Sequence, residues 1–210
     1  MLNQTIHQAV VAAPADVEKE AKLIAVLKSE AGQKEKADAF RELALCASRE
    51  SVGVLASFLD KEEYSHMARY ALEPIPDPAV DDVLRNALSS LKGRLLVGVI
   101  GSLGVRRGVK AVEKLIPLLK DGDADVAQAA ARALGSIGTA DAAEAIESAL
   151  ASTPKANQLA FCEGLFRSAE ALAAQGFQEN ALAIYQRLNQ VEGIHQVKTG
   201  AECGLKCMQK

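Results

Sequence analysis

Apolar residues between positions 124 and 138 recur every three or four positions, which is the spacing of one face of an α-helix. Asp123 or Asp125 can cap the start of this helix, and Gly138 can end it. The pattern therefore predicts an amphipathic helix with a buried stripe on one side. The stripe consists of Val126, Ala129, Ala130, Ala133, Leu134 and Ile137.

Similar patterns run along most of the chain, and turn signals such as Asp121-Gly122-Asp123 and Thr153-Pro154 separate them. No segment shows the alternation with a period of two that a half-buried strand requires. Pro117 lies inside one predicted helix, where its missing N–H should bend the helix without disrupting its neighbours. The expected helices form six pairs: 17–30 with 34–48, 51–60 with 63–73, 77–90 with 91–104, 109–121 with 124–138, 140–152 with 155–175, and 178–190 with 194–209.

The pairs also repeat in sequence. Ala71-Leu72, Ala133-Leu134 and Gly164-Leu165 occupy equivalent positions in their repeats. Ile100-Gly101-Ser102-Leu103-Gly104 matches Leu134-Gly135-Ser136-Ile137-Gly138 at a slightly longer spacing, which leaves a longer turn after Gly104. A period of about 31–34 residues is typical of two short helices that must stack on their neighbours to bury their apolar faces. The sequence therefore predicts an all-α, right-handed α-solenoid of about six stacked helix pairs.

One domain accounts for the length. Residues 1–16 are expected to be an N-terminal lead-in, and 17–210 a single solenoid domain. The chain could also be one module of a longer protein. Of its 210 residues, 49% are hydrophobic but only 4% are aromatic, so alanine and leucine must supply the core. The net charge of −3 gives no electrostatic reason to expect nucleic acid or an anionic membrane surface as a partner. No signal peptide or membrane-spanning run is visible, and a cytoplasmic location is expected.

Residues 109–138 resemble a HEAT repeat of the kind found in phycobilin-lyase-like HEAT proteins. That pattern joins L-x-x-L-L-x-D to V-R-x-x-A-A-x-A-L-G-x-I-G. The arginine that usually follows the valine is Ala127 here, which weakens any ladder of arginines and turn aspartates between repeats. The matching residues are Ile116, Leu119, Asp121, Val126, Ala130, Ala133, Leu134, Gly135, Ile137 and Gly138.

The C-terminal segment 153–210 differs from the rest. It contains Ala169-Glu170-Ala171-Leu172-Ala173-Ala174-Gln175-Gly176, followed by Ala181-Leu182-Ala183-Ile184-Tyr185-Gln186-Arg187-Leu188, and this pair of segments looks like a tetratricopeptide helix pair. A longer helix and bulkier core side chains suggest that it caps the stack. The bulky residues are Phe161, Phe166, Phe177 and Tyr185.

Candidate catalytic and metal-binding residues are sparse. His7, His66 and His195 are isolated, whereas HEAT proteins that bind two irons use His-Glu pairs on successive repeats. The spacing that metal ligands need is absent, so no metal, cofactor or catalytic residue is expected.

Cys203 and Cys207 allow two interpretations. Cys203 and Cys207 lie one helical turn apart on one helix face, and packing as small hydrophobes is the favoured role. A labile redox or metal site with His195 is the alternative, because such a site needs thiolates in an electropositive, accessible setting. Arg106-Arg107 is the densest basic pair, and a solvated turn explains it better than a nucleic-acid groove does.

In HEAT stacks, the second helix of each pair lines the concave surface. Alignment of these helices on Ala133-Leu134 gives one solvent-facing column through Tyr70, Gly98, Arg132, Glu163 and Cys203, and another through His66, Arg94, Gln128 and Leu159. Mixed columns suit a protein or peptide partner, which a few anchors such as Tyr70 and Arg132 would hold. The predicted partner-binding residues are His66, Tyr70, Arg94, Gln128, Arg132 and Glu163.

The favoured function is a non-catalytic scaffold or adaptor that binds a protein or peptide, without nucleic acid, membrane or cofactor. An accessory or lyase-type enzyme like the phycobilin-lyase HEAT proteins is the alternative, and it rests on the resemblance alone.

Overall fold

The computed structural model describes residues 14–208, and within them the chain forms twelve α-helices and no strand. The predicted lead-in, 1–16, falls mostly outside the described residues, as does His7. Helix α1 begins at Pro14, slightly before the predicted start of the domain. The helices form the six predicted pairs: α1 (Pro14–Lys28) with α2 (Gln33–Cys46), α3 (Arg49–Ala56) with α4 (Ser65–Leu72), α5 (Pro78–Ala87) with α6 (Gly93–Val105), α7 (Val112–Leu115) with α8 (Ala124–Ile137), α9 (Ala140–Leu150) with α10 (Lys155–Ala174), and α11 (Gln178–Leu188) with α12 (His195–Met208).

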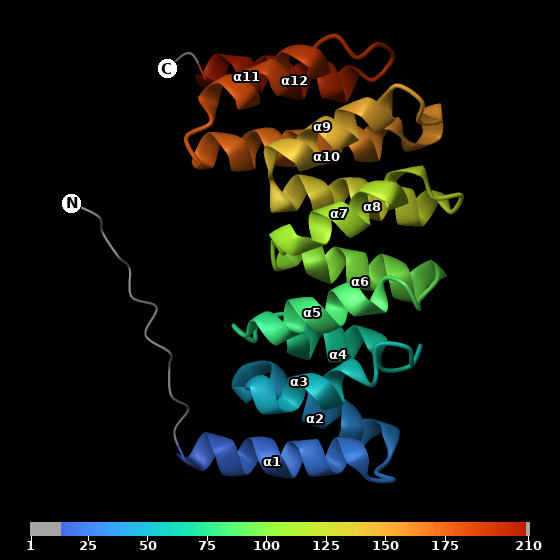
Figure 1. Cartoon of the computed structure of the whole chain (residues 1–210), viewed down its shortest axis with the longest axis vertical. Coiled ribbons are helices and arrows are strands. Elements are labelled where there is room, and N and C mark those ends of the chain that lie inside the picture. The colour runs from blue at the N-terminus through green and yellow to red at the C-terminus, as the bar shows by residue number, and fades with distance from the viewer. Residues whose placement is uncertain (1–13, 209–210) are drawn as a thin grey trace, which may run out of the picture.

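The pairs stack along the long axis of the molecule, from α1 at one end to α11 and α12 at the other (Figure 1). The even-numbered helices pack on one another along most of the stack. The fold is therefore an α-solenoid, as predicted.

Helix starts follow the local capping chemistry. The Asp123 carboxylate accepts a hydrogen bond from the backbone N–H of Asp125 at 2.9 Å, and Gly138 ends α8 in the left-handed conformation with φ of 69°. Asp77 caps α5 in the same way, and Pro78 follows it in the first turn. Both predicted ends of α8 are confirmed.

The helix predicted over 109–121 is broken rather than bent. It consists of a 3-10 turn at Val109–Ala111, the short α7, and a second 3-10 turn at Ile116–Lys120. Pro117 has no N–H to donate to the carbonyl four residues earlier, and its ring crowds that carbonyl, so the α-helical pattern cannot continue through it. Leu115 and Leu119 remain buried, and the stack continues across the break.

The core is aliphatic along most of the stack, and three of the four bulky residues expected near the C-terminal end, Phe161, Phe166 and Tyr185, belong to it or pack against it. Phe161 is buried as expected, whereas Phe177 is 54% exposed. A cluster that was not predicted lies near the N-terminal end, where the Phe40 ring centroid is 5.2 Å from Phe58 and 5.9 Å from Tyr64.

The even-numbered helices approach one another through equivalent contacts in successive repeats. Between α4 and α6, the Ser102 hydroxyl donates to Glu73 at 2.7 Å. One repeat later, a Cβ placed on Gly104 of α6 would lie 2.9 Å from the Cα of Ala133 on α8. After one more repeat, a Cβ on Gly135 of α8 would lie 2.1 Å from the carbonyl oxygen of Gly164 on α10. Residues without a Cβ therefore let α6, α8 and α10 pack almost backbone to backbone.

Candidate functional site

The even-numbered helices expose large apolar side chains to solvent. We call the solvent-exposed side of α2, α4, α6, α8, α10 and α12 the even-layer face. Tyr70 on α4 is 57% exposed, Val105 at the end of α6 is 66% exposed, and Leu159 on α10 is 46% exposed. Apolar groups of this size are the kind that a binding partner buries.

The predicted partner-binding residues all lie on these helices. His66 and Arg94 are exposed on α4 and α6. Gln128 and Arg132 are half-buried on α8, and Glu163 is half-buried on α10. Their role as a binding site remains a prediction.

The structure brings two of the predicted residues together. The Nε of Arg132 donates to the Glu163 carboxylate at 2.7 Å, and this ion pair links α8 to α10. Gln128 donates from its side-chain amide to Asn157 at 3.0 Å. Partly exposed pairs of this kind contribute little to stability, about 0–1 kcal/mol.

The two columns of residues that were aligned on Ala133-Leu134 are out of register at α6. The sequence alignment placed the wrong residues of α6 in them. The repeated contacts of Gly104 with Ala133 and of Gly135 with Gly164 fix this register. It aligns Val97 and Gly101 with Gln128 and Arg132, in place of Arg94 and Gly98. Gly98 instead faces α4, where the guanidinium of Arg69 donates to its carbonyl oxygen at 3.2 Å. Burial lowers the pKa of Arg69, and Glu73 partly offsets this effect.

A hollow of about 450 Å³ on the even-layer face lies over α6 and α8, and Arg167 of α10 borders it. Val97, Val105 and Ala129 line it together with three arginines, Arg107, Arg132 and Arg167. We call it the arginine groove. Sequence reasoning placed Arg132 on this face, assigned Arg107 only to a solvated turn, and missed Arg167. In the register that the glycine contacts fix, Val105, Ser136 and Arg167 occupy equivalent positions in successive repeats. An alignment of the sequence in that register would have placed Val105 and Arg167 together at the edge of the groove.

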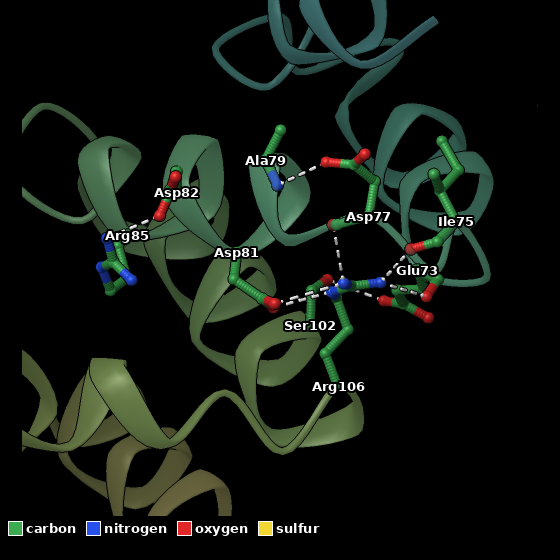
Figure 2. A network of polar contacts seen from close by, with 9 residues as sticks. All are labelled: Glu73, Ile75, Asp77, Ala79, Asp81, Asp82, Arg85, Ser102 and Arg106. Carbon is green, nitrogen blue, oxygen red and sulfur yellow. Dashed lines mark hydrogen bonds and ion pairs between the residues drawn. The ribbon is translucent and has the colours of Figure 1, made fainter. Parts of the chain in front are cut away.

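Arg106 stabilises the turn that contains Arg107. Arg106 donates to both carboxylate oxygens of Asp81, at 2.7 and 3.2 Å, and to three backbone carbonyls, those of Glu73, Ile75 and Asp77 (Figure 2). The side chain of Arg106 is only 10% exposed. The prediction that Arg106 belongs to a solvated turn is therefore wrong, because it joins the end of α6 to the α4–α5 turn.

The cysteines differ in their surroundings. Cys203 and Cys207 are exposed on α12, so the prediction that they pack as small hydrophobes is wrong for both. Cys162 is buried on α10, where burial and the nearby Glu163 raise the pKa of its thiol to about 11. Among the described residues, no group of three or more His, Cys, Asp or Glu side chains is arranged to hold a metal ion.

The helices within residues 14–208 include none that is both long enough and apolar enough to cross a lipid bilayer.

Residues 82–165 match the family model for HEAT repeats, a range that runs from α5 into α10. The central part of this chain consists of HEAT repeats. The search of curated proteins finds no match to the sequence.

Solved structures share the fold. A crystal structure of an engineered protein from the Northeast Structural Genomics Consortium has a TM-score of 0.53 and 23% identity, and the match covers 91% of this chain and 96% of that chain. A second engineered protein from the same consortium has a TM-score of 0.53 and 24% identity, over 93% of this chain and 59% of that chain. Similarity at this level extends the helical-repeat fold beyond the HEAT repeats to nearly the whole chain.

Proposed function

We propose that this chain is a non-catalytic scaffold that binds a protein or peptide across the even-layer face. The observation that carries the proposal is the exposure of Tyr70, Val105 and Leu159 on successive parts of this face. A partner that lies along the stack buries all three, and truncation of such anchors typically costs about 1–4 kcal/mol of binding free energy.

The geometry of the stack supports the same proposal. Because α6, α8 and α10 approach one another at backbone distance, we expect the solenoid to curve toward their side and to present a concave surface there. A partner on a concave repeat surface contacts several repeats at once. His66, Arg94 and Gln128 lie around the apolar anchors and supply polar contacts at the rim.

The test compares two double variants against a partner captured from the native cell extract, identified by mass spectrometry and then purified. We expect Tyr70→Ala with Leu159→Ala to weaken its binding at least tenfold, measured by isothermal titration calorimetry. The matched control, Asp82→Ala with Glu113→Ala, changes exposed residues on the odd-numbered helices α5 and α7 and should leave the affinity unchanged. Circular dichroism should show equal helix content in all proteins. Unchanged affinity in the Tyr70 and Leu159 variant, or an equal loss in the control, would place the binding site elsewhere.

A further inference from the structure

The arginine groove differs in charge from four other hollows of the described surface. Its lining includes three arginines and no carboxylate, although the chain has more acidic than basic residues. Four other hollows each include at least one carboxylate, from Asp60, Glu147 or Glu192. Glu163 neutralises Arg132, so Arg107 and Arg167 make the groove a local cationic site on a chain of negative net charge.

The arginines of the groove keep most of their hydrogen-bonding capacity. Arg132 uses its Nε for Glu163, and no described residue accepts from its two terminal nitrogens. Arg167 donates to the hydroxyl of Ser136 at 3.1 Å, which is a neutral partner. The guanidinium of Arg107 has no hydrogen-bond or ion-pair partner within residues 17–208, and its side chain is exposed. A guanidinium binds a carboxylate through two parallel hydrogen bonds, so these groups suit carboxylate ligands.

The backbone at Arg107 is the second observation. Its φ is +52°, and within residues 14–208 it is the one non-glycine residue with a positive φ. Its N–H donates to the carbonyl of Gly104, and the N–H of Gly108 donates to that of Leu103, which is the hydrogen-bond pattern of a Schellman motif. The helices α8 and α10 end with glycine at this left-handed position, at Gly138 and Gly176. An arginine there is strained, and the Arg106 network described above holds the turn in place despite the strain.

Apolar side chains lie beside the arginines. Val105 is exposed close to Arg107 in the chain, and Val97 and Ala129 are half-buried in the same hollow. No aromatic ring that could stack on a nucleic-acid base is in the lining. The combination favours a ligand that carries carboxylates next to an aliphatic or aromatic side chain.

We propose that the arginine groove binds an acidic segment of a partner protein, whose Asp or Glu side chains pair with Arg107, Arg132 and Arg167 while an adjacent apolar side chain packs on Val97, Val105 and Ala129. This inference rests on the proposed function and adds the chemistry of the partner.

The first test selects random 12-residue peptides displayed on phage against the full chain, with counter-selection on the variant Arg107→Gln with Arg132→Gln and Arg167→Gln. We expect the selected peptides to carry at least two Asp or Glu residues beside a Leu, Ile or Phe. A synthetic peptide of the selected sequence should bind the triple variant at least tenfold more weakly than the wild type. A second peptide, in which Asn replaces each Asp and Gln replaces each Glu, should bind the wild-type protein at least tenfold more weakly than the selected peptide does. The matched control, Arg41→Gln on α2, should bind the peptide as the wild type does.

The second test separates the role of Arg107 from a general effect on folding. Arg107→Gly relieves the strained backbone, so its melting temperature should rise, while its affinity for the selected peptide should fall at least threefold. Equal or tighter binding by Arg107→Gly would remove Arg107 from the site.

Four outcomes overturn the inference. Selected peptides without an excess of acidic residues would contradict it, as would equal binding to the triple variant. Binding of a 20-residue oligothymidylate as tight as that of the peptide, and lost in the triple variant, would assign the groove to phosphate backbones. If a partner requires Tyr70 and Leu159 but tolerates the triple variant, the proposed scaffold function stands and this inference fails.

Discussion

At the residue scale, Arg106 and Arg107 are neighbours with opposite roles. Arg106 is largely buried and donates to Asp81 and three carbonyls, whereas Arg107 is exposed at the edge of the arginine groove. The Arg106 side chain stabilises the turn, and the turn places the Arg107 side chain beside the groove.

The first stability prediction concerns Arg106. Arg106→Gln should lower the free energy of unfolding by about 2–4 kcal/mol, because it leaves Asp81 and three carbonyls of the α4–α5 turn without their charged donor. Arg41→Gln is the control, since its ion pair with Asp38 is exposed and contributes less than about 0.5 kcal/mol. Urea unfolding followed by circular dichroism measures both. A loss for Arg106→Gln no larger than that for the control would show that the network contributes little.

The second residue-scale prediction concerns the thiols. At pH 8, Cys203 and Cys207 should react rapidly with a thiol-specific chromogenic disulfide, and Cys162 should react only when α10 opens. Between pH 9.0 and about 11, the Cys162 thiol is ionised in the unfolded chain but protonated in the folded one. The free energy of unfolding should therefore decrease as the pH rises through this window, and Cys162→Ala should reduce that decrease. Rapid reaction of Cys162 in the native protein would contradict the burial of its side chain.

At the scale of the helix, the glycine contacts determine how closely the repeats stack. Gly135→Ala should lower the free energy of unfolding by about 1–3 kcal/mol, because its Cβ would overlap the backbone of Gly164 and push α8 from α10. Gly53→Ala on α3 is the matched control. No atom lies within 4 Å of its added Cβ, so the greater helix propensity of alanine should raise stability by about 0.5–1 kcal/mol. Equal effects of the two changes would mean that the close approach does not limit packing.

The helix pairs could be predicted from sequence because helical periodicity and turn residues are local signals. Pro117 predicted a distortion of the helix over 109–121. The extent of that distortion depended on whether the neighbouring 3-10 turns could still bury Leu115 and Leu119, which the sequence does not show. The register of α6 was misjudged because a short string of similar residues matched best at a spacing that the packing does not use. The contact of Gly104 with Ala133 fixes the register, and such contacts between helices leave little trace in a string comparison.

At the scale of the whole molecule, the candidate face could be located from the repeat, but its chemistry could not. Tyr70 and Arg132 were found because they share a column. The bonds of Arg106 were missed because three of its acceptor groups are backbone carbonyls, which every residue has. The arginine groove was missed because its members come from three elements whose side chains meet only after the repeats have stacked.

The contact between Gly135 and Gly164 also gives the stack a one-sided mechanical response. Repulsion between two backbones in contact rises steeply as they approach, whereas packing attraction declines gradually as they separate. We therefore expect the α6–α8 and α8–α10 contacts to resist closing toward the even-layer face more strongly than they resist opening. Between α4 and α6, the side chains of Glu73 and Ser102 stand between the helices and can change rotamer, so this joint is more compliant. A stack with these joints should open more readily than it closes, and the proposed partner should therefore be bulky rather than thin.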